Sequence, residues 1–189
     1  MNRGYFQKFQ IKDVVFLAIM SAVALATGAV MPLVISLQLL IFGISQLVTA
    51  LQIGVFFAIG LYKVRKPGSL LLMALMMGLI QLMMSPPMFL SSVLNGVLIE
   101  LIVLLLFGGY EKDSAVFCAA MLHTPLSLPF NYLYNRLIKG ADSPLAAVAD
   151  RAPLAAVGMT LAVVAVSALG ALIGIKIARE LKKSGVLKK

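Results

Sequence analysis

The amino-acid sequence predicts an all-α fold, a bundle of helices that crosses a lipid bilayer several times. Of the 189 residues, 61% are hydrophobic and 12% are charged, whereas ordinary soluble domains carry about 25% charged residues. The mean hydropathy is +1.03, and the apolar residues form long blocks without the alternation of a membrane β-barrel. Because only helices and closed barrels satisfy their backbone groups inside a bilayer, we expect one polytopic membrane domain over residues 1–189.

The first predicted helix covers residues 13–31 and carries a face of small side chains. Residues 14–30 hold no charge, and the segment approaches the roughly 20 apolar residues that a membrane span needs. Ala18, Ala22 and Ala26 recur at every fourth position, so they share one face that a second helix can approach closely. This face is predicted to be a docking surface, either for a helix of the same chain or for a partner protein.

Five further apolar blocks predict five further membrane helices. The basic stretch 63–68 separates the second block from the third, and Ser85-Pro86-Pro87 separates the third from the fourth. The fifth block is broken by Pro125 and Pro129, which membrane helices keep where neighbours satisfy the freed carbonyl groups. A polar loop over residues 139–151 precedes the sixth block. The predicted spans are residues 13–31, 39–62, 69–84, 88–107, 114–138 and 152–175.

The basic residues are divided unevenly between the two sides of such a bundle. Three precede the first span, three lie between the second and third, one lies between the fourth and fifth, and six follow residue 175. The other three are Arg136, Lys139 and Arg151. Because cytoplasmic loops are enriched in Lys and Arg, both termini are predicted to be cytoplasmic in a bacterial cell membrane. Attraction to anionic membrane lipid then explains the net charge of +9, and no nucleic-acid partner is expected.

The chain lacks the motifs of the common enzyme classes. It has no glycine-rich phosphate loop and no HExxH zinc motif, and it has one His and one Cys. A metal cluster or a disulfide framework therefore has no ligands to form it. We expect neither an enzyme nor a cofactor bound to this chain, and Cys118 is expected to be a buried structural thiol.

Neutral polar side chains gather in the outer half of the predicted membrane. They come from four predicted spans, and residues four apart, such as Ser91 and Asn95, share a helix face. Amides and hydroxyls can hydrogen-bond a solute without the cost of burying charge, although single residues of this kind also hold membrane helices together. We expect the first outer loop and Ser85-Pro86-Pro87 to roof the site. The predicted substrate-binding residues are Gln46, Gln81, Ser91, Asn95, Asn131, Tyr134 and Asn135.

Glu100 is the only acid well inside a predicted span. An intramembrane carboxylate is by default a functional candidate. The alternatives are contact with a partner subunit and a structural pair with a loop cation such as Lys63 or Lys112. The sequence leaves these roles open.

His123, the only histidine, lies in the middle of the fifth span. A lone membrane histidine most simply donates to a backbone carbonyl, and Pro125 and Pro129 free carbonyls nearby. The sharper hypothesis is ligation of a metal or a tetrapyrrole. In that case the partners of His123 would be Met83, Met84 or Met88.

Several of these features occur together in a known family. A basic amino end running into KDVVFLAIMSAVALA, an uncharged first outer loop, six spans and a Lys/Arg tail resemble the substrate-binding S components of energy-coupling factor (ECF) transporters. The runs KPGSLLLMALMMGLIQLMMSPP and LNGVLIELIVLLLFGGY are similar to the Trep_Strep family within that group.

The resemblance implies an S-component-like bundle that captures a vitamin or another micronutrient. Such a subunit has no ATPase of its own and works with a transmembrane coupling subunit and two cytoplasmic ATPases, which use the ATP. The helix-one alanine motif of the family carries over onto Ala18, Ala22 and Ala26, which would contact the coupling subunit. The chain contains no Trp, so it lacks the tryptophan stacking platforms that some thiamin-type S components use. This absence argues against that ligand.

Other functions remain open from the sequence. A tetrapyrrole or metal compound such as haem is an alternative cargo for the same import system. A self-sufficient ion-coupled secondary transporter would need a coupling carboxylate, for which only Glu100 is available, and usually an internal repeat, which the sequence does not show. A structural or assembly subunit of a larger membrane complex is the third class.

Overall fold

A computed structural model of the chain describes residues 8–28, 34, 36–140, 143–185 and 187. These residues form seven α-helices and one short 3-10 helix, and none of them lies in a β-strand. The all-α prediction is therefore confirmed. The elements are α1 (Ile11–Thr27), η2 (Ser36–Leu39), α3 (Ile44–Lys63), α4 (Ser69–Leu82), α5 (Pro86–Phe107), α6 (Asp113–Leu137), α7 (Pro144–Arg151) and α8 (Pro153–Lys183).

Three helices, α3, α5 and α8, are long and apolar enough to cross a membrane. Helix α4 is apolar but has only 14 residues, and α1 has 17. Length and composition thus support a multi-pass membrane protein, and the count of six spans stays a prediction. Helix α8 is the longest, with 31 residues, or about 46 Å at 1.5 Å per residue. It exceeds the roughly 30 Å of bilayer hydrocarbon, so a membrane accommodates it by tilt or with one end projecting.

Several predicted boundaries are wrong at the ends of helices. The second span does not start at residue 39, because η2 and a left-handed Gly43 (φ 75°) precede α3. The Ser85-Pro86-Pro87 connection already contains the first turn of α5, where proline is favourable because the first helical N–H needs no partner. Residues 139–151, predicted as a polar loop, include the whole of α7. The sixth helix continues from residue 175 to Lys183.

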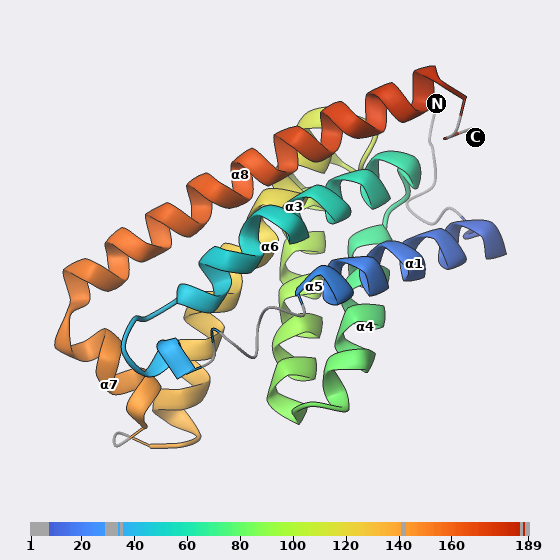
Figure 1. The fold of residues 1–189 in the computed structure, drawn as a ribbon. Coiled ribbons are helices and arrows are strands. Elements are labelled where there is room, and N and C mark those ends of the chain that lie inside the picture. The colour runs from blue at the N-terminus through green and yellow to red at the C-terminus, as the bar shows by residue number, and fades with distance from the viewer. Residues whose placement is uncertain (1–7, 29–33, 35, 141–142, 186, 188–189) are drawn as a thin grey trace.

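Helix α3 is the centre of the arrangement and packs on α1, α6 and α8. Helices α4 and α5 form a hairpin that contacts α1 on one side and α6 on the other. Figure 1 shows this hairpin crossing the direction shared by α1, α3 and α8. The polar residues of interest lie where α3 and α5 begin and where α4 and α6 end. We call this the cavity end of the bundle and the opposite end the basic end.

The contact between α3 and α8 depends on glycines that let the two backbones approach. A Cβ at Gly170 would lie 2.3 Å from the Leu51 carbonyl oxygen, and a Cβ at Gly174 would lie 2.5 Å from that of Val55. Both distances are far below van der Waals contact. The two glycines form a GxxxG pattern on α8, the spacing with which membrane helices commonly bring backbones together.

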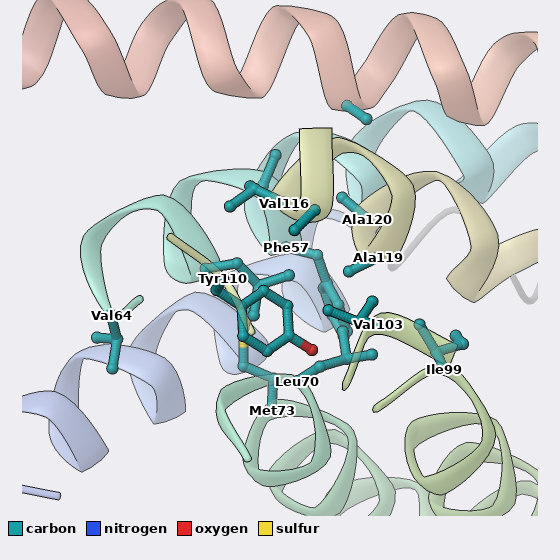
Figure 2. Packing of buried hydrophobic residues seen from close by; sticks show 14 of the residues in the cluster. Phe57, Val64, Leu70, Met73, Ile99, Val103, Tyr110, Val116, Ala119 and Ala120 are labelled. Atoms are coloured by element: carbon teal, nitrogen blue, oxygen red, sulfur yellow. The ribbon is translucent and has the colours of Figure 1, made fainter. Parts of the chain in front are cut away.

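The apolar core lies between α3, α4, α5 and α6, towards the basic end. Figure 2 shows Tyr110, from the turn before α6, in the middle of this cluster among Phe57, Leu70 and Met73. All four side chains are fully buried. This core fixes the positions of the helices whose other halves surround the cavity.

Helix α6 continues without a break through Pro125 and Pro129, contrary to the sequence prediction. A proline at position 125 cannot donate to the carbonyl of Met121, one helical turn earlier. The hydroxyl of Ser167, on α8, donates to that carbonyl instead, at 2.7 Å. The prediction that a neighbour satisfies a freed carbonyl is therefore confirmed for Pro125, with Ser167 and not His123 as the donor.

Helix α1 does not use its alanine face to pack inside this chain. Its buried residues are Leu17, Ser21 and Ala24, and the Ser21 hydroxyl donates to the Met73 carbonyl of α4 at 3.1 Å. Ala18 is half-buried, and Ala22 and Ala26 are exposed. The interpretation of the alanine face as an internal packing surface is therefore wrong for Ala22 and Ala26, and those two positions are free for an external contact.

Candidate functional site: a polar cavity between four helices

A cavity of about 230 Å³ lies between α3, α4, α5 and α6 at the cavity end. Its volume is somewhat below the ~300–1,000 Å³ of typical sites for drug-sized ligands, so a small solute fits it best. The seven residues predicted to bind substrate all line this cavity: Gln46, Gln81, Ser91, Asn95, Asn131, Tyr134 and Asn135. Their convergence is a property of the fold, and their role in binding stays a prediction.

Part of the polar lining is engaged in holding the helices together. The Asn135 amide donates to the Asn131 carbonyl at 2.8 Å and accepts from the Ser143 hydroxyl at 3.1 Å, so it ties α6 to the segment before α7. The hydroxyl of Ser92 donates to the Ala74 carbonyl at 2.9 Å and joins α5 to α4. The contacts of Asn135 and Ser92 are therefore those expected of residues that hold membrane helices together.

The first turn of α3 is organised in the same way. Ser45 accepts a hydrogen bond from the Gln38 amide and donates to the Gln46 side-chain oxygen at 2.8 Å. Thr49 donates to the Ser45 carbonyl at 2.9 Å. These contacts hold the side-chain oxygen of Gln46 at the wall of the cavity.

The deepest part of the lining, which we call the cavity floor, consists of Asn95, His123 and Thr124. All three side chains are at least nine-tenths buried. The Asn95 side-chain oxygen, both His123 ring nitrogens and the Thr124 hydroxyl are buried and have no hydrogen-bond partner among the described residues. Most buried polar atoms in proteins are paired, and each unpaired one costs free energy. Four such atoms on one cavity therefore point to a ligand.

The Phe57 ring holds His123 in place from behind. The two ring centroids are 4.3 Å apart and the planes are tilted by 45°, and Phe57 is fully buried. Because Phe57 belongs to the apolar core, the imidazole is fixed on a rigid support. The predicted hydrogen bond from His123 to a backbone carbonyl is wrong, because both ring nitrogens are unpaired among the described residues. Thr49, Asn95 and His123 line the same cavity, but they are far apart in the sequence, so the sequence did not predict that they lie together.

Gln38, Ser85, Pro87 and Leu145 come from short elements and turns at the cavity end and also line the cavity, and we call this part of the lining the entrance. Gln38 and the Ser85–Pro87 turn were expected there as parts of the roof, whereas residues 29–33 and 35 of the first outer loop lie outside the described residues. Leu145 belongs to α7, which the sequence did not predict. Lys139 also lines the entrance, with its ammonium 5.8 Å from the centroid of the Tyr134 ring.

Comparison with known protein families decides the family of the chain. The model of the bacterial integral membrane protein family Trep_Strep, whose members are described as hypothetical, matches residues 11–183. The chain belongs to the Trep_Strep family. No curated protein and no solved structure is detectably similar to it. This match confirms the resemblance to the Trep_Strep family. It also confirms the prediction of a bacterial integral membrane protein.

Glu100 of this Trep_Strep chain is a structural residue of the basic half and does not line the cavity. Its carboxylate accepts from the backbone N–H of Gly68 at 2.6 Å and of Leu71 at 3.4 Å, and from the Tyr110 hydroxyl at 2.8 Å. It thus satisfies free N–H groups at the start of α4, where the helix dipole favours a negative charge. The pair with Lys63 or Lys112, one of the alternatives left open by the sequence, is not formed.

Tyr110 completes this arrangement in the turn between α5 and α6. Burial raises the pKa of the Tyr110 hydroxyl well above its ordinary value, and the nearby Glu100 carboxylate raises the pKa further. The hydroxyl therefore keeps its proton and remains a hydrogen-bond donor to Glu100. The contact closes the α4–α5 hairpin at the end away from the cavity.

The metal hypothesis for His123 finds little support in this Trep_Strep structure. Met83 and Met84 are 90% and 65% exposed and do not line the cavity; only Met88 does. Within the described residues, no group of three or more His, Cys, Asp or Glu side chains is placed to hold a metal ion. The described lining offers one imidazole, from His123, and two thioethers, from Met77 and Met88, which is a poor basis for a resident metal.

A larger, open hollow of about 490 Å³ lies at the basic end, lined by residues such as Lys12, Lys63 and Lys182. Several charges in and beside it are paired: Lys66 contacts Asp13 at 2.6 Å, and Asp113 contacts both Arg179, at 2.6 Å, and Arg65. The hollow contributes no buried polar atom without a partner within the described residues. Despite its smaller volume, the cavity between the four helices is the better candidate site.

Proposed function

We propose that this Trep_Strep protein is the substrate-binding S component of an ECF-type importer. It captures a vitamin or another micronutrient on the outer side of the membrane. A transmembrane coupling subunit and two cytoplasmic ATPases then drive its release inside, so this chain needs no cofactor of its own.

The cavity is the observation that supports the proposal most strongly. Neutral amides and hydroxyls from four helices meet around one space, and the floor carries buried polar atoms without protein partners. The lining of the cavity contains no carboxylate among the described residues. Such a site suits binding and release of a solute and offers no group for covalent chemistry.

The alanine face of α1 supports the need for a partner protein. Ala22 and Ala26 are exposed on a helix that already buries another face, with Leu17, Ser21 and Ala24, in the bundle. Small side chains allow another helix to approach closely, which is how membrane helices associate. The coupling subunit is the partner that the family resemblance implies for Ala18, Ala22 and Ala26.

The alternatives receive less support from the contacts. An ion-coupled secondary transporter would use Glu100, whose carboxylate is already occupied by three protein donors. A tetrapyrrole is a poor match for a cavity of about 230 Å³ whose floor has one imidazole. A purely structural role would not explain why buried polar atoms around the cavity have no partner among the described residues.

Co-expression with an ECF coupling subunit and its ATPases tests the proposal. We expect the complex to co-purify and to take up substrate with ATP, and we expect the purified single chain to retain a small solute that mass spectrometry identifies. Ala22→Leu should abolish assembly and uptake while the solitary protein still folds and keeps its solute. Ala24→Leu, at a buried position of the same helix, is the control and should impair folding. Uptake by the isolated protein driven by an ion gradient would refute the proposal.

A further inference from the structure

The hydrogen-bonding groups of the cavity floor define what a ligand must offer. An imidazole in an apolar interior is favoured in its uncharged form, in which one ring nitrogen donates and the other accepts. The Asn95 side-chain oxygen accepts, its amino group donates, and the Thr124 hydroxyl can do either. The floor therefore asks for two ligand donors, one for Asn95 and one for His123. It also asks for one ligand acceptor, for the His123 N–H.

The charge around the floor excludes ions at this position. None of the described residues that line the cavity is an acid, and the one charged side chain among them, Lys139, is exposed at the entrance. A carboxylate placed on the floor would leave the Asn95 oxygen and the unprotonated His123 nitrogen without a donor. An ammonium group has only donors and would leave the His123 N–H without an acceptor. Either ion would also lose its hydration without an opposite charge nearby.

We propose that the floor binds an uncharged head group with two N–H donors and one carbonyl acceptor. A carboxamide attached to a ring, or the amino and oxo edge of a heterocycle, has this pattern. The inference rests on the proposed function, because it names the chemistry of the solute that the S component captures. The remainder of the solute lies towards the entrance, where Tyr134 offers an aromatic face and Lys139 a positive charge.

Three small probes of similar shape test the head-group pattern. Benzamide has two N–H donors and a carbonyl, N,N-dimethylbenzamide keeps the carbonyl without the donors, and benzoate replaces the amide by an anion. We expect calorimetry on the purified, solute-free protein in detergent to show benzamide binding at least tenfold more tightly than either analogue. Equal binding of the three probes, or no binding of benzamide at about 10 mM, would overturn the inference.

Variants of the floor separate a binding role from a structural role. Thr124→Val and Asn95→Leu replace polar groups by apolar groups of similar size. Each should weaken benzamide binding severalfold or more and leave Tm unchanged or raise it by roughly 2–4 °C, because an unpaired buried group is removed. A fall of Tm in both variants would show that the floor is satisfied within the apo protein and would overturn the inference.

Ser21→Ala is the matched control. The Ser21 hydroxyl is buried, does not line the cavity and already shares its proton between the Leu17 and Met73 carbonyls, at 2.9 and 3.1 Å. This change should lower Tm and leave the benzamide affinity within twofold. Loss of benzamide binding in this variant would show that any weakening of the fold removes binding, against the inference.

The outcome can be read independently of the proposed function. If the wild-type chain co-purifies with the coupling subunit and ATPases but does not discriminate among the probes, the head-group inference fails alone. If the probes are discriminated but no coupling subunit binds, the site remains and the S-component assignment fails.

Discussion

Two buried polar residues of α5, Glu100 and Asn95, differ in whether the protein satisfies their hydrogen bonds. Glu100 has three protein donors, from Gly68, Leu71 and Tyr110. Asn95, five residues earlier on α5, has an unpaired buried oxygen. A carboxylate inside a membrane protein is costly unless donors surround it, so Glu100 is explained by the fold alone. Asn95 is not, and a residue that the fold leaves unpaired is a candidate for binding.

Glu100→Gln should destabilise the protein without affecting the cavity. The neutral amide loses the charge-assisted bonds to the start of α4 and presents an N–H₂ group to backbone donors. We expect a loss of about 1.5–3 kcal/mol in the free energy of unfolding, measured by thermal or denaturant unfolding in detergent. Solute affinity should be unchanged. A variant of full stability that has lost transport would instead favour the ion-coupled transporter.

At the scale of helices, α8 makes two contacts that hold the bundle together: it packs closely on α3, and it supplies a donor to a carbonyl of α6. Gly170 and Gly174 let α8 touch the backbone of α3, and Ser167 donates to the Met121 carbonyl of α6. One face of α8 therefore holds two other helices. This explains how α6 keeps its helical path through Pro125 and carries His123 and Thr124 to the cavity floor.

The bond between Ser167 and Met121 should matter only while residue 125 is a proline. Ser167→Ala should lower the free energy of unfolding by about 1 kcal/mol. In a Pro125→Ala background, the restored N–H of residue 125 can donate to Met121 itself, so Ser167→Ala should cost less than half as much. A double-mutant cycle measured by unfolding in detergent gives the coupling. Equal costs in the two backgrounds would show that Ser167 acts through packing only.

At the scale of the whole molecule, charge and cavity occupy opposite ends. Ion pairs from Lys66, Arg65 and Arg179 cluster at the basic end, where α3 ends and α6 begins. The cavity end has a single ion pair among the described residues, between Arg136 and Asp150 at 3.4 Å. Lys- and Arg-rich ends of membrane proteins usually face the cytoplasm. We therefore expect the cavity to open to the outside.

Cysteine labelling in intact cells tests this orientation. In a Cys118→Ala background, Arg151→Cys at the end of α7 should react with a membrane-impermeant maleimide. Lys183→Cys at the end of α8 should react only after the cells are permeabilised. Both native side chains are exposed, so neither result depends on burial. The reverse pattern would place the cavity on the cytoplasmic side and would remove the basis for capture from outside.

The sequence by itself determined the class of the protein and most of its helices. Composition and long apolar blocks are enough for an all-α membrane protein, because the bilayer admits few other structures. The predicted segment around residues 69–84 begins at the observed residue of α4, since glycine and proline signals are local. The seven polar residues were selected from the same local pattern, by their depth in the predicted spans.

Only the tertiary structure decided which polar groups are satisfied and which are not. Ser167 and Met121 are 46 residues apart, and Gly68 and Glu100 are 32 apart, so no local pattern pairs them. The same holds for the cavity floor, which joins Asn95 of α5 to His123 and Thr124 of α6. A helix has a fixed periodicity that a sequence displays, but the rotation and contact of one helix against another depend on packing of the whole bundle. For that reason the residues of the site could be predicted from the sequence, whereas only the fold decides which of their polar atoms have hydrogen-bond partners.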